Sequence, residues 1–251
     1  MAISPSRLST PDGNTLVFEK IEGASPGVVF LHGLKSDRHG NKANALASYC
    51  SKRGYGFLCY DMYGHGESSG RFEDGGPSRW RDDAVAVLDK LTRGPQILVG
   101  SSMGGWVMLL AALARPDRIA GLIGIAVAPD FTNMPMELSD AQRDQLARDG
   151  AVNLESSYIE EPMHISRHLI EDGNRNLLLG GPIAVTCPVR LLHGQCDDSV
   201  PWQRSMRVAE CLAGGDVETI LIKDGDHRLS RDGDLALLGS TLDLLVERVR
   251  P

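Results

Sequence analysis

The chain has 251 residues, a length that fits one sizeable α/β domain and leaves too little for two full domains. Hydrophobic residues make up 42% and charged residues 24% of the sequence, as in ordinary globular proteins. The formal net charge of −7, with no cluster of Lys or Arg to offset it, argues against a nucleic acid as partner. No apolar stretch approaches the ~18 residues needed to cross a bilayer, which argues against a membrane span.

The amino terminus and the cysteines indicate a reducing compartment. Residues 1–7 lack the apolar core of a secretory signal. We therefore expect a cytoplasmic protein, with the mitochondrial matrix as the alternative if a transit peptide has been removed. The cysteines form no C-x-x-C pair, which argues against a disulfide framework and against a zinc site. The five are Cys50, Cys59, Cys187, Cys196 and Cys211.

Short β-rich runs alternate with amphipathic segments along the first half of the chain. Gly54 is suited to end a helix, and Ser78 is suited to begin one. In chain order the expected elements are a strand at 16–18, a strand at 28–31 after a Gly/Ser/Pro turn, a helix at 42–53, a strand at 57–60 and a helix at 78–91.

The alternation continues, with one interruption. The next elements are a strand at 97–99, a helix at 106–114, a strand at 122–126, then a strand at 189–192, a helix at 202–212, a strand at 217–222 and a helix at 232–248. The stretch 129–188 breaks the pattern and holds a charged helical segment at 139–149. We therefore predict a single α/β domain over residues 1–251, with a doubly wound, mostly parallel sheet and a small lid insertion at 129–188.

A glycine-flanked serine lies between the strand at 97–99 and the apolar helix that follows. Residues 100–104 read Gly-Ser-Ser-Met-Gly. A strand-to-helix turn this tight strains its central residue and requires small neighbours. The Ser102 hydroxyl then stands clear of the sheet, beside helical N–H groups that bind anions. The pattern predicts Ser102 as a nucleophile; the alternative is a glycine-rich turn that only packs the helix on the sheet.

A serine nucleophile needs a base, and chain order restricts the choice among seven histidines. On a doubly wound sheet with this turn, the order is Ser, then Asp or Glu, then His. His193 ends the strand at 189–192 ahead of any acid in the loop after it. His227 follows that loop and comes directly after the strand at 217–222, so it is the predicted base. The alternative for His227 is a solvated loop histidine.

The orienting carboxylate is expected in the loop after the strand at 189–192. Asp197 and Asp198 compete there, and Asp197 is favoured because it lies closer to the strand end. Asp198 is suited to capping the helix near Trp202. Asp130, which follows the strand at 122–126, is a third candidate.

Two backbone N–H groups must stabilise the oxyanion of a tetrahedral intermediate. We expect the N–H of Met103, directly after the nucleophile, and the N–H of Leu34, in the turn after the strand at 28–31. We interpret His32 as a structural brace of that turn. His65 and Glu67 are interpreted as loop-fixing side chains, and no metal site is predicted.

Methionines are candidates for an adaptable apolar substrate pocket, because Met fills irregular shapes. The candidates in the insertion are Met134, Met136 and Met163. The alternative is that they only pack the insertion on the core.

Taken together, these motifs resemble the α/β-hydrolase superfamily over nearly the whole chain. The matching segments are residues 100–105, 31–33, 64–68 and 193–201. Residues 94–106 and 187–194 are similar to a subgroup that contains a mitochondrial acyl-protein (palmitoyl) thioesterase, which also hydrolyses acyl glucuronides. The turn at 32–34, His-Gly-Leu, looks more like that of bacterial esterases.

The resemblance implies a serine esterase or thioesterase with Ser102, Asp197 and His227 as its triad. Such an enzyme acts on small-molecule or acylated-protein substrates and needs no metal or organic cofactor. Two alternatives remain open from the sequence. One is a hydrolase of carbon–carbon bonds with the same triad, and the other is a ligand receptor that kept the fold and lost turnover.

Overall fold

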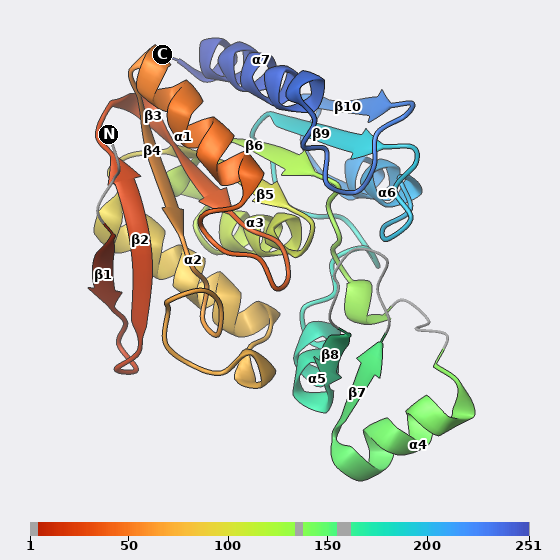
Figure 1. Ribbon diagram of the computed structural model, residues 1–251. Coiled ribbons are helices and arrows are strands. Elements are labelled where there is room, and N and C mark those ends of the chain that lie inside the picture. Colours follow the sequence, from red (N-terminus) through yellow and green to blue (C-terminus); the bar gives the residue numbers. More distant parts are fainter. Residues whose placement is uncertain (1–4, 134–137, 155–161, 251) are drawn as a thin grey trace.

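The structure is a computed structural model that describes residues 5–133, 138–154 and 162–250. Its centre is an eight-stranded sheet in the order β1-β2-β4-β3-β5-β6-β9-β10, with helices on both faces (Figure 1). All pairings from β4 to β10 are parallel, and the pairings of β1 with β2 and of β2 with β4 are antiparallel. The predicted mostly parallel, doubly wound sheet is therefore confirmed.

The strands of this sheet agree with the apolar runs, with two differences near the amino terminus. An edge strand, β1, was not predicted, because its four residues carry no apolar run and gain their order by pairing with β2. The β3 strand begins within the turn expected at 23–27, since Ala24 already pairs with Tyr55. The strands are β1 (Ser6–Ser9), β2 (Thr15–Ile21), β3 (Ala24–Leu31), β4 (Tyr55–Tyr60), β5 (Gln96–Ser101), β6 (Ile119–Ile125), β9 (Val189–Gly194) and β10 (Val217–Ile222).

The helices cover the two faces unequally. Helices α1 and α7 lie on one face, and α2, α3 and α6 lie on the other (Figure 1). Their bounds are α1 (Asn41–Arg53), α2 (Pro77–Leu91), α3 (Met103–Ala114), α6 (Gln203–Cys211) and α7 (Asp232–Val249). Because successive side chains of a strand point to opposite faces of the sheet, β3 contributes to the core on both faces. Val28 and Phe30 pack toward α1 and α7, whereas Val29 and Leu31 pack toward α2 and α3.

The N-cap residue of α2 was predicted wrongly. Helix α2 begins at Pro77 with Gly76 at its N-cap, rather than at Ser78. Proline suits the first helical position because it lacks an N–H and has a fixed φ. The capping oxygen comes from elsewhere in the chain: the Ser78 N–H donates to the carboxylate of Asp172 at 2.8 Å.

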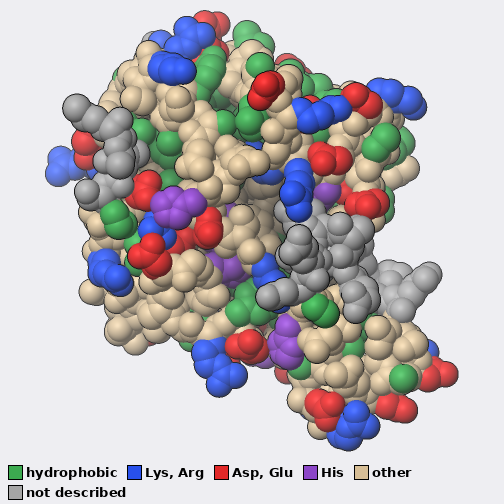
Figure 2. Space-filling model, in the orientation of Figure 1, with side chains coloured by type: hydrophobic (Ala, Val, Ile, Leu, Met, Phe, Trp, Pro, Cys, Tyr) green, Lys and Arg blue, Asp and Glu red, His purple; other side chains and the backbone are tan. Residues whose placement is uncertain are grey.

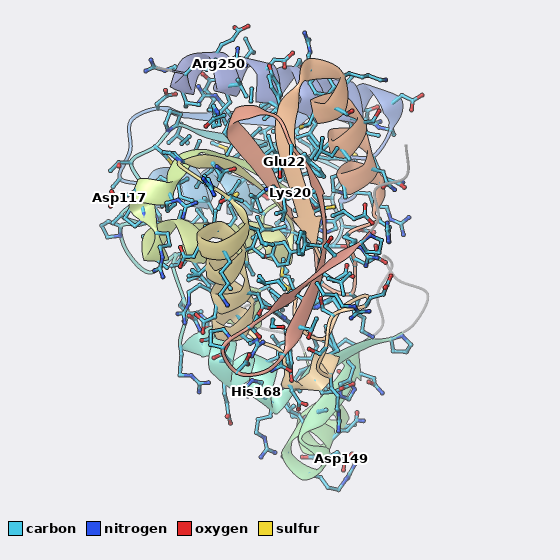
Figure 3. The ribbon with its side chains drawn as sticks, turned by 90° about the vertical axis from the view of Figure 1, so that its left-hand side faces the viewer. Lys20, Glu22, Asp117, Asp149, His168 and Arg250 are labelled. Atoms are coloured by element: carbon cyan, nitrogen blue, oxygen red, sulfur yellow. The ribbon has the colours of Figure 1, made fainter. Side chains whose placement is uncertain are left out.

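The insertion forms a small unit at one end of the molecule. It contains α4 (Asp140–Asp149), β7 (Ala151–Leu154), β8 (Met163–Ser166) and α5 (Arg167–Asn174), with β7 and β8 antiparallel. The helix predicted at 139–149 is confirmed, and Ser139 with Gln142 forms a capping box at its start. Figure 3 shows Asp149 and His168 at the end of the molecule opposite Arg250, while α5 packs on α2.

None of the helices in the described part of the chain combines the length and the apolar character that a membrane crossing requires.

Candidate active site

Ser102 occupies the turn between β5 and α3. Its backbone angles, φ +54° and ψ −121°, lie in a region that L-residues other than glycine rarely adopt. Backbone hydrogen bonds hold it there: the Ser102 N–H donates to Ile125 at 2.9 Å, and its carbonyl accepts from Ala128 at 3.1 Å. The turn thus raises the serine side chain above the edge of the sheet, and that side chain remains partly exposed.

The glycines around Ser102 are required by the closeness of neighbouring backbone. A Cβ atom on Gly104 would lie 2.2 Å from the carbonyl oxygen of Leu31. A Cβ atom on Gly100 would lie 2.5 Å from the carbonyl oxygen of Gly104. Since real Cβ atoms do not approach backbone this closely, the motif spacing follows from how closely α3 packs on β3 and β5.

Three predicted residues meet at the carboxyl ends of β5, β9 and β10. The His227 ring places Nδ1 2.7 Å from Asp197 Oδ2 and Nε2 3.2 Å from Ser102 Oγ. Because an ionised carboxylate only accepts, His227 Nδ1 carries the proton and Nε2 accepts from the serine hydroxyl. The geometry is that of a nucleophile, a base and an orienting acid in series.

The carboxylate of Asp197 accepts four hydrogen bonds. Oδ1 accepts from the N–H groups of Ser199 and Val200 at 2.9 and 2.7 Å, and Oδ2 accepts from His193 and His227. Burial on its own would raise the pKa of Asp197, but the hydrogen bonds from the two histidines outweigh it and hold that pKa well below its usual range. Asp197 is therefore ionised at neutral pH.

His193 is a second histidine on this carboxylate, and sequence reasoning missed its part. Its Nε2 lies 3.0 Å from both Asp197 Oδ2 and the carbonyl oxygen of Val200, so Nε2 carries the proton. Its Nδ1 then accepts from the hydroxyl of Ser205 at 2.7 Å. Chain order excluded His193 as the base, but its position four residues before Asp197, at the end of a buried strand, was an available signal.

The two rival acids have other partners. Asp130 accepts the backbone N–H groups of Leu178 and Leu179, both at 2.8 Å, and so ties the end of the insertion to the turn after β6. Asp198 is exposed and accepts from the Ser199 hydroxyl at 3.1 Å. The N-cap of α6 is Trp202, with no side-chain capping bond, so the capping role considered for Asp198 is not observed.

The turn that contains Leu34 lies against the serine. A Cβ atom on Gly33 would be 3.4 Å from Ser102 Cβ, and Met103 begins α3 directly after the serine. Within the described residues, neither the Leu34 N–H nor the Met103 N–H donates to a protein acceptor. Both donors are therefore available beside Ser102, as an oxyanion hole requires.

His32 braces this turn in the neutral form. Burial lowers its pKa to about 4. Its Nε2 accepts from the Met62 N–H at 3.1 Å, so Nδ1 carries the proton and donates to the Gly33 carbonyl at 2.8 Å. That carbonyl belongs to the same peptide unit as the Leu34 N–H, so His32 sets the orientation of this predicted oxyanion donor.

The loop after β4 is held by an ion-pair cluster and by ring packing. The buried Arg38 guanidinium pairs with Asp61 and with Glu67, and Asp61 also accepts the Arg38 N–H. The ring of His65 packs edge-on against His32, with 4.9 Å between centroids. Among the described residues, no group of three or more His, Cys, Asp or Glu side chains is placed to hold a metal ion.

Of the three methionines predicted to line a substrate pocket, one lies in the described part of the chain. Met134 and Met136 lie outside the described residues. Met163 is described only through its backbone in β8, which pairs with Leu154 of β7. A cavity of about 330 Å³ lies between the insertion and the turn after Leu34, where Lys35, Phe72 and His164 line it. Figure 2 shows charged and His side chains near the middle of this face, beside the residues drawn in grey.

A larger cavity lies away from the triad. Its volume is about 760 Å³, and it is lined by residues at the amino ends of β3 and β5, including Gly27 and Gln96. Lys20 in β2 and Glu22, which follows the end of β2, also line it and are labelled in Figure 3. Since the triad occupies the carboxyl ends of β5, β9 and β10, this cavity has no part in its chemistry.

Comparisons with known proteins agree with this fold. The sequence profile of the alpha/beta hydrolase fold matches residues 26–178. The mitochondrial palmitoyl-protein thioesterase ABHD10 of Homo sapiens is 40% identical over 252 residues, covering 98% of this chain and 81% of the relative. Esterase Rv0045c of Mycobacterium tuberculosis is 32% identical over half of this chain and 41% of its own length.

Solved structures have the same architecture. Alpha/beta hydrolase domain-containing protein 10 from mouse superposes with a TM-score of 0.92 at 40% identity, covering 98% of this chain and 100% of the mouse chain. Est1E from Butyrivibrio proteoclasticus, with ferulic acid bound, has a TM-score of 0.81 at 20% identity, over 96% of this chain and 98% of its own. The second likeness concerns the fold alone.

Proposed function

Because the chain belongs to the α/β-hydrolase family, we propose that it is a serine hydrolase that cleaves carboxylic ester or acyl thioester bonds through an acyl-enzyme intermediate. The observation that carries the proposal is the series from Ser102 through His227 to Asp197, with contacts of 3.2 and 2.7 Å. Relatives named as thioesterases and esterases support this bond class.

In the first step, Ser102 Oγ attacks the carbonyl carbon while its proton passes to His227 Nε2. The imidazolium that forms is stabilised by the ionised Asp197 at Nδ1. The carbonyl oxygen becomes negatively charged and is stabilised by the N–H groups of Leu34 and Met103. The amino terminus of α3 adds its favourable dipole.

In the second half of the reaction, the tetrahedral intermediate expels the leaving oxygen or sulfur, which takes the proton from His227 Nε2. The acyl group is now esterified to Ser102. Water then gives its proton to His227 and attacks the same carbonyl, and collapse releases the carboxylic acid and restores the Ser102 hydroxyl. Each proton transfer uses one ring nitrogen that is already placed beside the reacting oxygen.

Ser102→Ala tests the nucleophile. We expect the turnover of p-nitrophenyl butyrate to fall by at least about 10³-fold, and labelling by a fluorophosphonate probe to be lost, because both reactions need the Ser102 oxygen. Ser48→Ala, an exposed serine on α1, is the matched control and should retain both activities. Probe labelling that persists in Ser102→Ala would show that another residue is the nucleophile.

The acyl portion is proposed from the relatives. Relatives named palmitoyl-protein thioesterases lead us to propose acylated proteins or small acyl thioesters as substrates. Turnover should be profiled with acyl thioesters and oxygen esters from acetyl to palmitoyl length. A preference for long-chain thioesters is expected, whereas activity confined to acetyl or butyryl oxygen esters would contradict the thioesterase proposal.

The two alternatives from the sequence have less support. The two relatives described above are named as a thioesterase and an esterase. Neither is named as a carbon–carbon bond hydrolase or as a receptor. Mass spectrometry of the protein mixed with a p-nitrophenyl ester separates the proposed enzyme from a silent receptor, because the proposed enzyme gains one acyl group on Ser102. A silent receptor gains none.

The cellular compartment that we propose is taken from the relatives and differs from the cytoplasmic location expected from the sequence. The comparisons do not support the cytoplasmic location, because the mammalian relatives are named as mitochondrial. We therefore propose the mitochondrial alternative, which fractionation of the source cells would test.

A further inference from the structure

A cavity of about 160 Å³ lies between the start of α1 and segments that flank the residues of the triad. It touches three segments of the candidate site: Gly33 in the predicted oxyanion turn, Ser101 directly before the nucleophile, and Arg228 directly after His227. Its volume is about five times the share of one water molecule in the liquid, enough for one carboxylate or phosphate group.

The polar side chains around this cavity are cationic, hydroxyl or amide groups, and Phe30 adds an aromatic ring. Lys42 and Arg228 supply the charge, and Ser36 and Ser230 supply hydroxyls. Among the described residues that line it, none is Asp or Glu. The Lys42 ammonium donates to the carbonyl oxygen of Arg228, which joins α1 to the loop that carries His227.

Lys42 is half-buried, and its charge lacks a direct carboxylate contact in the described structure. Burial lowers the pKa of Lys42 to about 8, although the more distant charges of Asp226 and Asp234 act in the opposite direction. A bound anion would stabilise the charged ammonium and so raise this pKa again.

The amino terminus of α1 adds to the positive potential. This helix has 13 residues, begins at Asn41 and has no acidic residue in its first turn. Its N-cap is Gly40, which has no side chain to accept the first N–H groups. Such a terminus favours an anion through its free N–H groups and its dipole.

Ser101 provides a second, independent observation. The residue is only 6% exposed, yet its hydroxyl makes no hydrogen bond within the described part of the chain. It lines the same cavity. This oxygen is not fully buried: it opens into the cavity, where a hydrogen-bonding ligand can reach it.

We propose that this cavity binds an anionic group, a carboxylate or a phosphate, carried by the leaving portion of the substrate. The assignment to the leaving portion rests on the proposed function. In that mechanism the leaving atom takes its proton from His227, so the group that departs lies on the His227 side of Ser102. Arg228, which follows His227, and Ser101, which precedes Ser102, place the cavity on that side.

Matched chromogenic esters test the proposal. The wild-type protein is assayed with p-nitrophenyl butyrate, with the same ester carrying a ring carboxylate, and with one carrying a ring phosphate. For the preferred charged ester we expect Lys42→Met to lower kcat/KM about tenfold more than for the neutral ester, since one charged hydrogen bond is lost. Added salt should weaken the same preference.

Three variants separate the cavity from general effects of charge. Lys42→Arg keeps a cation and should keep most of the preference. Ser101→Ala should lower it by a smaller factor, about threefold. Lys52→Met removes an exposed lysine from the other end of α1 and should leave the ratio of charged to neutral turnover unchanged. Equal losses on charged and neutral esters in Lys42→Met would overturn the proposal.

Direct binding distinguishes failure of the subsite from failure of the mechanism. Titration calorimetry with inorganic phosphate and with acetate uses the Ser102→Ala protein, so it requires no turnover. Binding of either anion that Lys42→Met abolishes supports the cavity even if no ester is cleaved. Neutral-ester turnover without a charged-ester preference, and without Lys42-dependent binding, would refute the subsite while leaving the triad in place.

Discussion

The two histidines on Asp197 differ in what their other ring nitrogen contacts. His227 presents Nε2 to Ser102, whereas His193 presents Nδ1 to the hydroxyl of Ser205. His227 can therefore exchange a proton with a substrate, while His193 is closed within the protein, with no exposed surface. We interpret His193 as a positioning residue that fixes one oxygen of the carboxylate and draws negative charge away from it.

His193→Phe tests this interpretation. In this variant Asp197 would keep three of its four hydrogen-bond donors. Its carboxylate would then carry more negative charge beside His227 and stabilise the His227 imidazolium more strongly. We expect the acid limb of the kcat/KM profile to move to higher pH by roughly 0.5 to 1 unit. Stability should fall by about 1 to 3 kcal/mol, because Ser205 and the Val200 carbonyl lose a buried partner.

The conservative variant gives the control. In His193→Gln the side-chain amide can replace Nε2 as donor to Asp197, so the pH profile should return toward that of the wild type. A profile that does not move in His193→Phe, despite lower stability, would reduce His193 to a purely structural role.

At the scale of elements, the strand–turn–helix unit around Ser102 depends on contacts between backbones. Helix α3 approaches β3 so closely that only glycine fits at position 104. The strained φ of Ser102 is then maintained by neighbours on β6 and by the turn after it, rather than by its own preferences.

Gly104→Ala should separate α3 from β3 and misplace Ser102, the proposed nucleophile. We expect fluorophosphonate labelling to slow by more than about tenfold, and the free energy of unfolding to fall by about 2 kcal/mol or more, since backbone must move to admit the methyl group. Gly180→Ala is the control, because a Cβ atom there meets nothing within 4 Å. Unaltered labelling in Gly104→Ala would contradict the close packing of α3.

The insertion is tied to the sheet through Asp130, whose two carboxylate oxygens each accept one N–H from the segment at 178–179. In Asp130→Ala we expect limited proteolysis to cut faster within residues 129–188, because about 1 to 3 kcal/mol of local hydrogen bonding is lost. Fluorophosphonate labelling of Ser102 should persist. Loss of labelling in a folded Asp130→Ala protein would return Asp130 to the list of candidate acids.

At the scale of the whole molecule, neutral histidines buried beside the site make stability depend on pH. Burial has the largest effect on the pKa of His65, and repulsion from a protonated His32 ring comes second. Together they lower this pKa to about 3. Above about pH 6.5 both folded and unfolded states are neutral at this position. As the pH falls below that value, the unfolded state takes up a proton and the folded state does not, so stability decreases.

His65→Phe should weaken this dependence. The new ring can keep the packing against Phe72 and Trp80, and it removes a buried Nε2 that has no partner in the described structure. Between pH 7.5 and 5.0 the wild type should lose about 2 kcal/mol more unfolding free energy than the variant, at roughly 1.4 kcal/mol per pH unit below 6.5. Urea titrations at the two pH values measure the difference, and parallel losses would refute it.

Much of the fold was predictable because its signals are local. Continuous apolar runs marked the buried parallel strands, and the glycine spacing marked the turn at Ser102. Ser78 was assigned wrongly as a cap because the capping oxygen comes from Asp172, 94 residues later. The edge strand β1 carried no signal of its own, since its order depends on pairing with β2.

The sequence by itself determined the fold class, the position of Ser102 and the short set of histidines and aspartates able to serve it, because strand periodicity, turn sterics and chain order act over short stretches. Only the tertiary structure decided that Asp197 contacts His227 while Asp130 holds the insertion, that His193 shares the carboxylate, and that Lys42 and Ser101 border one cavity. The physical reason is distance along the chain. Ser102 and His227 are separated by 125 positions, so their hydrogen bond exists only once the sheet has aligned its strand ends.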